Sequence, residues 1–238
     1  MPQYGDPKYW NERYSKYKDS TFDWLEDFKS LEPLLLQFVN KTDRILMLGC
    51  GNAEISEDMY DAGFKDITNI DISSVVIQTM SERNSDKTGM VWQVGDVTNM
   101  PEFESNSFDV LIDKSTIDAL LCAENSYVMT AKMLREAQRV LKVGGYYIAI
   151  SYGSPESRAF HLEREFLVWD RKEFLLRDVE ERKEESEEKK EEEKIHYIYV
   201  CCKNEVADYA SEMYFDLVID KLQEQYLLEK LREAEEDA

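Results

Sequence analysis

The chain has 238 residues, of which 43% are hydrophobic, so it can bury one sizeable core and we expect a single main domain. Its net charge of −21 would repel a nucleic-acid backbone, whereas a basic protein surface would be attracted to it. The four cysteines lack the paired spacing of a metal site, and the sequence has neither a signal or transit segment nor an apolar run of membrane-spanning length. We therefore expect a cytoplasmic protein with no nucleic-acid, membrane or metal partner.

Two aromatic residues stand out in the N-terminal segment YGDPKYWNERY. Trp10 and Tyr14 lie four residues apart, so in a helix they share one face. This face could close over a bound ligand, or it could simply pack the helix on the rest of the domain. The segment FDWL, which contains Trp24, follows shortly afterwards.

Five strand-length apolar runs alternate with stretches of helical spacing over the next part of the chain. The runs are 44–49, 67–72, 90–96, 108–114 and 146–151. The last intervening helix covers 131–145, and we expect Gly144 and Gly145 to end it, because glycine tolerates a left-handed cap. Such alternation predicts an α/β fold in which helices cover both faces of a parallel sheet.

The C-terminal third predicts an antiparallel hairpin at one sheet edge, formed by a strand within 166–178 and a second at 195–204. Between them, residues 180–194 contain no apolar side chain and are predicted to form a solvated tip, a charged helix or a disordered loop. We expect residues 205–238 to form a helical extension of a domain spanning 1–204. Its apolar face would carry Tyr214, Leu217, Val218 and Leu222, and its tail is acidic.

The first predicted strand ends in the turn GCGN, with glycine at positions 49 and 51. A strand that ends in Gly-x-Gly and passes directly into a helix lets the backbone approach a ligand that any Cβ would meet. A tight turn without a ligand would also use glycine, so this turn alone does not decide between the two.

Acidic residues end the following strands. Asp71 lies twenty residues beyond Gly51, where a carboxylate can accept hydrogen bonds from ribose hydroxyls. Asp96, followed by Val97, ends the third strand, and Asp113 lies at the end of the fourth. Each acid alone is commonly a helix cap or a solvated turn. Because parallel strands end at one edge of a sheet, all three beside a glycine turn predict a nucleoside-binding rim.

The series ILMLGCGN, NIDIS, VGDVTNMPEFESNSFDVLIDKSTIDALL and VLKVGGYYIAIS resembles the class I S-adenosylmethionine-dependent methyltransferases over about 4–204. This resemblance implies a Rossmann-like, doubly wound, mostly parallel seven-strand sheet. YGDPKYWNERY, FDWL, GCGN and DKSTIDALL together resemble the elongation factor 1-alpha lysine methyltransferases of the methyltransferase-like group, whose relatives include a citrate synthase lysine methyltransferase. Met47 and Ala53 depart from the broad pattern, and an apolar residue at position 47 favours the narrower group.

The resemblance implies that the chain binds S-adenosylmethionine and methylates a lysine of a protein, with elongation factor 1-alpha as the named candidate. The implied cofactor contacts are Trp10, Tyr14, Trp24, Gly49, Gly51, Asp71, Ile72, Asp96, Val97 and Lys114. Because methyl transfer to an amine is a direct displacement, no metal is required. We further expect Asp113, at the fourth strand end, to help place the acceptor amine.

Other functions remain open at this point. A nicotinamide-dependent dehydrogenase also uses a glycine turn, but Glu54 stands where its third glycine would be, and a carboxylate there would repel a pyrophosphate. A noncatalytic binding module could keep the fold and act through its acidic loop and terminal helix. Within the methyltransferases, the acceptor could be another protein, as in the citrate synthase enzymes, or a small molecule.

Overall fold

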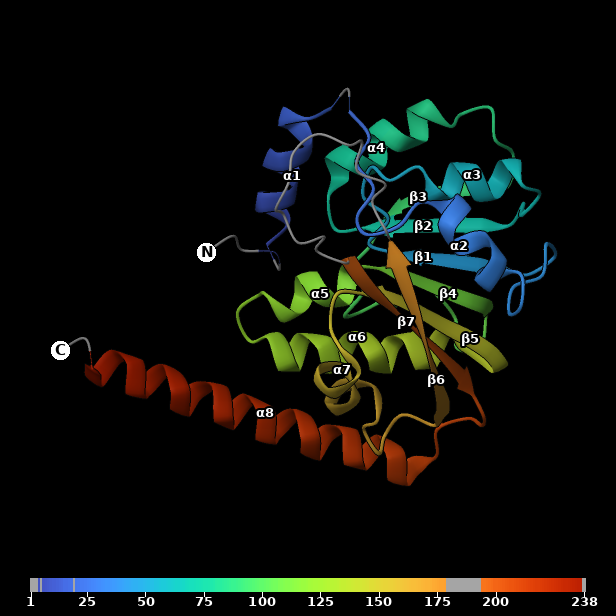
Figure 1. The fold of residues 1–238 in the computed structure, drawn as a ribbon. Helices are drawn as coiled ribbons and strands as arrows, with labels where there is room; N and C mark the ends of the chain where they lie inside the picture. The colour runs from blue at the N-terminus through green and yellow to red at the C-terminus, as the bar shows by residue number, and fades with distance from the viewer. Residues whose placement is uncertain (1–3, 5, 19, 179–193, 237–238) are drawn as a thin grey trace, which may run out of the picture.

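The computed structural model describes residues 4, 6–18, 20–178 and 194–236. A seven-stranded sheet in the order β3-β2-β1-β4-β5-β7-β6 forms its centre (Figure 1). The strands are β1 (Ile45–Leu48), β2 (Ile67–Asp71), β3 (Met90–Val94), β4 (Phe108–Lys114), β5 (Leu141–Ser151), β6 (Trp169–Asp178) and β7 (Lys194–Lys203). Strands β1 to β5 are parallel, whereas β7 is antiparallel to both β5 and β6. The predicted mostly parallel sheet with an antiparallel edge hairpin is confirmed.

The helices form two layers, one on each face of the sheet (Figure 1). One face carries α1 (Pro7–Lys16), α2 (Phe28–Leu35), α3 (Ile55–Asp61) and α4 (Ser74–Arg83), and the other carries α5 (Thr116–Leu121), α6 (Ser126–Val140), α7 (Pro155–Leu162) and α8 (Tyr209–Glu236). In β1, Ile45 and Met47 pack in the core on the face covered by α1 to α4, and Leu46 and Leu48 pack in the core on the face covered by α5 to α8. An all-apolar strand is therefore required here, because both of its faces are buried.

Helix α6 ends at Val140, so the prediction that Gly144 and Gly145 end it is wrong. The ammonium of Lys203 on β7 caps this end of the helix instead, because it donates hydrogen bonds to the carbonyls of Gln138 (2.7 Å) and Leu141 (2.6 Å). The two glycines lie within β5, where the pairing with β4 shifts register. Gly144 adopts φ +82° at this β-bulge, a left-handed backbone conformation that favours glycine.

The C-terminal helix α8 begins at Tyr209, and its first half packs into the hydrophobic core on the face of the sheet covered by α5 to α8. Val218 and Leu222 are buried as predicted, but Tyr214 and Leu217 are exposed. The face that packs on the domain instead includes the half-buried Phe215, whose ring packs against Phe166 at a centroid distance of 5.1 Å. Beyond Leu222 the described part of the helix is mainly exposed, and Figure 1 shows that its C-terminal end points away from the sheet.

The predicted charged stretch 180–194 lies outside the described residues, apart from Lys194, with which β7 begins. No helix within the described ranges is long and apolar enough to cross a membrane.

Candidate active site

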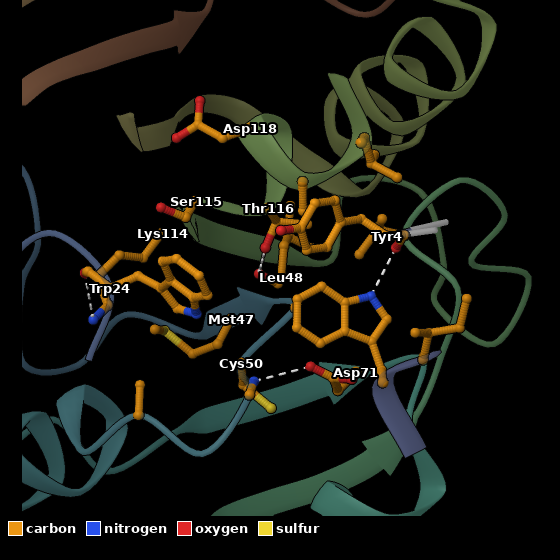
Figure 2. Close-up of a pocket in the computed structure, with 18 of the residues that line it drawn as sticks. Tyr4, Trp24, Met47, Leu48, Cys50, Asp71, Lys114, Ser115, Thr116 and Asp118 are labelled. Carbon is orange, nitrogen blue, oxygen red and sulfur yellow. Dashed lines mark hydrogen bonds between the residues drawn. The ribbon is translucent and has the colours of Figure 1, made fainter. Parts of the chain in front are cut away.

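A cavity of about 250 Å³ lies at the carboxyl ends of the parallel strands, where the N-terminal segment and α1 close over it (Figure 2). Its wall includes all ten side chains and glycines predicted to contact a cofactor, namely Trp10, Tyr14, Trp24, Gly49, Gly51, Asp71, Ile72, Asp96, Val97 and Lys114. Asp113 does not line it. The parallel sheet thus brings together residues that lie more than a hundred positions apart in the chain.

The glycine turn is shaped by the chain as well as by any ligand. Gly49 and Gly51 adopt φ +63° and +55°, a left-handed conformation that other residues rarely take. A Cβ at Gly51 would lie 2.8 Å from the hydroxyl oxygen of Tyr14, and one at Gly49 would lie 2.3 Å from Oγ1 of Thr116. Both positions therefore require glycine even before a ligand is considered.

Asp71 lies buried beside this turn. One carboxylate oxygen accepts the amide N–H of Gly51 and the other that of Ser73, each at 2.9 Å. Burial raises the pKa of Asp71 to about 6, although the two amide donors oppose the rise. Each oxygen has a further lone pair, so together they can accept two neighbouring hydroxyls. This arrangement fits the ribose of a nucleoside.

Asp96 and its neighbours form an adjoining part of the wall. Oδ1 of Asp96 accepts both the amide and the hydroxyl of Thr98 at 2.8 Å, whereas no donor among the described residues occupies Oδ2. Val97 is buried and Ile72 is half-buried, and both line the same cavity. A free carboxylate oxygen beside two apolar side chains can hold the amine and the flat ring of adenine.

Helix α1 covers the cavity with an aromatic pair. The rings of Trp10 and Tyr14 stack with centroids 5.7 Å apart, and the indole N–H of Trp10 donates to the carbonyl of Tyr4 (2.7 Å). Asn11, on the same helix, accepts the hydroxyl of Ser73 at 2.7 Å. The pair therefore both packs α1 on the domain and lines the cavity, so the two interpretations of its spacing are compatible.

Lys114 holds the segment that carries Trp24. Its ammonium pairs with the carboxylate of Asp23 and donates to the carbonyls of Trp24 and Glu26, each at 3.1 Å. Burial lowers the pKa of Lys114, whereas the nearby acids oppose this change. Lys114 lines the cavity, and its ammonium is held by the segment 23–26, so its predicted contact with the cofactor stays a prediction.

Asp113 is fully buried and does not line the cavity, which argues against the prediction that it helps to place the acceptor amine. Its oxygens accept the amides of Thr116 (2.8 Å) and Ile117 (3.2 Å) and the hydroxyl of Tyr147 (2.8 Å). Burial raises the pKa of Asp113 to about 7. The residue caps the start of α5, which is the ordinary structural role of an acid at a strand end.

Sequence motifs do not identify two polar side-chain pairs at the cavity, because the partners in each pair lie far apart in the sequence. Asp118 lines the cavity and pairs with Arg158, which lies forty residues later. Glu26 and His196 are both buried, with Oε1 and Nδ1 2.6 Å apart, and the imidazole packs edge-to-face against the ring of Tyr152 on the cavity wall. Nε2 of His196 has no hydrogen-bond partner among the described residues, so no nucleophile completes a hydrolytic triad there, and the pair ties β7 to the segment that carries Glu26.

Comparison with known proteins places this geometry in a defined class. An S-adenosylmethionine-dependent methyltransferase structure from Methanosarcina mazei has the same fold, with a TM-score of 0.55 at 18% identity over 77% of this chain and 99% of that one. The family model of the methyltransferase domain matches residues 39–232. The chain therefore belongs to the methyltransferase domain family.

The curated relatives are more specific in name. The eEF1A lysine and N-terminal methyltransferase of Danio rerio is 38% identical over 150 residues, which cover 63% of this chain and 21% of that protein. EEF1A lysine methyltransferase 4 of Mus musculus is 35% identical over 176 residues, covering 70% of this chain and 69% of that protein. The match thus spans about a fifth of the first relative and about two thirds of the second.

The family and the fold imply S-adenosylmethionine as the methyl donor, and the residues present fit this molecule. The buried Asp71 has lone pairs for the ribose, Asp96 has a free oxygen for the adenine amine, and the glycine turn leaves backbone rather than side chain on the wall. No group of three or more His, Cys, Asp or Glu side chains suited to a metal ion occurs in the described part of the chain.

Proposed function

We propose that this chain is an S-adenosylmethionine-dependent protein-lysine N-methyltransferase that acts on translation elongation factor 1-alpha. The observation that carries the proposal is the single cavity in which a buried carboxylate, a second strand-end carboxylate and a glycine turn meet under an aromatic cover. The names of the relatives support a lysine of elongation factor 1-alpha as the acceptor.

In this proposal each wall residue has a part in holding the cofactor. Asp71 binds the ribose, and Asp96, Ile72 and Val97 bind the adenine. The turn of Gly49 and Gly51 faces the amino acid part, with Trp10, Tyr14 and Trp24 covering the molecule; all of these residues line one cavity. When bound, S-adenosylmethionine supplies a methyl group activated by the positive charge on its sulfur.

The chain must then present a neutral amine, because a lysine ammonium has a reference pKa of about 10.4 and no free lone pair. Aromatic side chains at the cavity, including Phe22, Trp24 and Tyr152, exclude water from the amine and so favour its neutral form. The net charge of −21 would attract a basic substrate surface. We infer a cytoplasmic site of action, because elongation factor 1-alpha serves translation there.

Methyl transfer from labelled S-adenosylmethionine into an extract that lacks this protein tests the proposal. We expect one dominant labelled band at the size of elongation factor 1-alpha, identified by mass spectrometry and absent with Asp71→Ala. A different labelled protein would change the substrate. If the protein binds the cofactor but labels no protein, the acceptor is a small molecule or the domain is a noncatalytic module.

A further inference from the structure

We infer that Asp118 is the residue that binds and orients the acceptor amine, by accepting one of its N–H groups at Oδ2. This inference rests on the proposed function, because it names the group on the wall that receives the lysine. It replaces Asp113, the acid that lies five positions earlier in the same strand-to-helix segment.

The position of Asp118 suits this role. It lies in the first turn of α5 and lines the cavity. Figure 2 shows Asp118, Ser115 and Trp24 together on one side of the cavity, away from Asp71. Asp71 is therefore available for the ribose, and Asp118 lies on the other side of the cavity, where it is available for the acceptor.

The hydrogen bonds of Asp118 leave one oxygen open. Oδ1 accepts the guanidinium of Arg158 and the hydroxyl of Ser151, each at 2.5 Å. Oδ2 accepts the backbone amide of Tyr152 at 3.0 Å, in an exposed setting. A carboxylate oxygen can accept two hydrogen bonds, so Oδ2 has room for one N–H from a ligand. Oδ1 is used entirely by the chain.

Asp118 has a buried cationic partner. Arg158 is almost fully buried, and its guanidinium pairs with Oδ1 of Asp118. An ionised carboxylate first attracts the lysine ammonium and then, once the proton has gone to solvent, still accepts an N–H of the neutral amine. Because Arg158 offsets much of the negative charge, the carboxylate holds the amine in place without strongly favouring its protonated form.

The turn before α5 provides a second observation. Ser115 lines the cavity with φ +67°, a left-handed conformation that is costly for a residue with a Cβ. Its hydroxyl is buried and has no hydrogen-bond partner among the described residues. Strained backbone and an unsatisfied hydroxyl are both concentrated at ligand-binding positions. They occur here three residues before Asp118, whereas the oxygens of Asp113 are occupied by the amides of Thr116 and Ile117 and by the hydroxyl of Tyr147.

The surroundings of Asp118 also suit the stem of a lysine. Tyr152, whose amide holds Oδ2, is 59% exposed, and its ring rests edge-on against the buried His196 at a centroid distance of 5.1 Å. Trp24 is held in the wall by Lys114. An aliphatic chain passing these aromatic side chains would bring its amine to the open oxygen of Asp118.

Steady-state methylation of purified elongation factor 1-alpha by Asp118→Asn tests the inference. Asparagine removes the charge and keeps one acceptor oxygen, while its NH2 group replaces the oxygen that accepts from either Arg158 or Tyr152. We expect kcat/KM for the protein acceptor to fall about 10- to 100-fold, since a hydrogen bond to a charged group contributes about 1.5–3 kcal/mol. The affinity for S-adenosylmethionine, measured by calorimetry, should change less than about twofold, because Asp118 lies away from Asp71.

Two further variants keep the test decisive. Asp109→Asn, at the opposite end of β4, removes an aspartate that pairs with Lys142, and it should leave both constants unchanged. Asp113→Asn should lower the melting temperature but not kcat/KM for the acceptor. The inference is wrong if Asp118→Asn turns over like the wild type, or if Asp113→Asn alone loses acceptor kcat/KM with its melting temperature unchanged. If the wild type itself neither binds the cofactor nor turns over, the proposed function fails instead.

Discussion

The two sides of the cavity are built in different ways. On the nucleoside side, Asp71 accepts backbone amides from the glycine turn and from Ser73, and Asp96 accepts that of Thr98. On the acceptor side, the groups are held by side chains from distant segments: Lys114 by Asp23, Asp118 by Arg158, and His196 by Glu26. The first side is set mainly by main-chain donors, and the second mainly by pairs of polar side chains from distant segments.

This difference has a functional consequence. Backbone geometry at the ends of parallel strands changes little when side chains are substituted, so the nucleoside side suits a constant cofactor. Side-chain pairs can be exchanged without rebuilding the sheet, so substitutions on the acceptor side can change the acceptor without changing the fold. Substitutions on the two sides should therefore separate cofactor affinity from acceptor turnover.

The largest effect is expected for Gly51→Val on the nucleoside side. A Cβ there would lie 2.8 Å from the hydroxyl of Tyr14 at φ +55°, so both the turn and the aromatic cover must move. We expect a loss of about 100-fold or more in S-adenosylmethionine affinity by calorimetry, equivalent to about 3 kcal/mol. Gly144→Ala is the matched control, because Gly144 has φ +82° but nothing within 4 Å of its Cβ position. Equal binding by Gly51→Val and the wild type would contradict this account of the turn.

A smaller effect, on the other side, is expected for Lys114→Met. It leaves the carboxylate of Asp23 unpaired and frees the carbonyls of Trp24 and Glu26, which releases that segment from the wall. We expect acceptor kcat/KM to fall about 30-fold and the free energy of unfolding to fall by about 3 kcal/mol. Lys142→Met removes a more exposed pair with Asp109 and should have little effect on either quantity. A greater loss of cofactor affinity than of acceptor turnover would show that the two sides are not separable.

The pH dependence of cofactor binding distinguishes the sides further. The pKa of Asp71 is raised to about 6, so this carboxylate is ionised above that pH and protonated below it. We expect S-adenosylmethionine affinity to be constant above pH 7 and to fall about tenfold for each pH unit well below 6, because binding then requires loss of a proton. Calorimetry from pH 5 to 8 measures this, and Asp71→Asn should lack that dependence.

The raised pKa of Asp71 also affects the stability of the free protein. The folded-state pKa lies above the unfolded value of 3.8, so the fold binds this proton more tightly than the unfolded chain does. The contribution of Asp71 to stability is therefore most favourable below pH 3.8 and declines as pH rises through about 6. Comparing denaturant unfolding of the wild type and Asp71→Asn across this window should reveal the decline. A difference independent of pH would contradict it.

The smallest effect is expected for Thr98→Val. This change removes the hydroxyl that donates to Oδ1 of Asp96 at 2.8 Å but keeps the backbone amide that donates to the same oxygen. We expect cofactor affinity to fall about fivefold, in line with the loss of one hydrogen bond worth about 1 kcal/mol. Acceptor KM at saturating cofactor should not change. A change in acceptor KM with no change in cofactor affinity would contradict the assignment of Asp96 to the nucleoside side.

The sequence predicts that the glycine turn, Asp71 and Asp96 share one rim, because the determinants of their positions are local. A glycine turn directly follows β1, and Asp71 and Asp96 follow β2 and β3, so a linear pattern is enough to place them on one rim. The same logic misplaces Asp113, since a strand-end acid can equally cap the next helix, and the contacts of Thr116 and Ile117 decide in favour of the cap.

The acceptor side and two details of the fold depend on contacts that no local pattern reveals. Asp118 acquires its role from Arg158 and Ser151, which lie 40 and 33 residues later. Helix α6 ends where Lys203 of β7 satisfies its carbonyls, rather than at the next glycines. Which face of α8 packs on the domain depends on the surface that it meets. That face includes Phe215, Val218 and Leu222, whereas Tyr214 and Leu217 are exposed.

The most direct measurement is a calorimetric titration of S-adenosylmethionine into the full chain and into Asp71→Ala. The account predicts one binding site in the wild type and an affinity lowered about 100-fold or more in the variant, because two hydrogen bonds to a buried carboxylate are lost. No binding to the wild type, or equal affinity for the two proteins, would contradict the central claim that this cavity holds the methyl donor through Asp71.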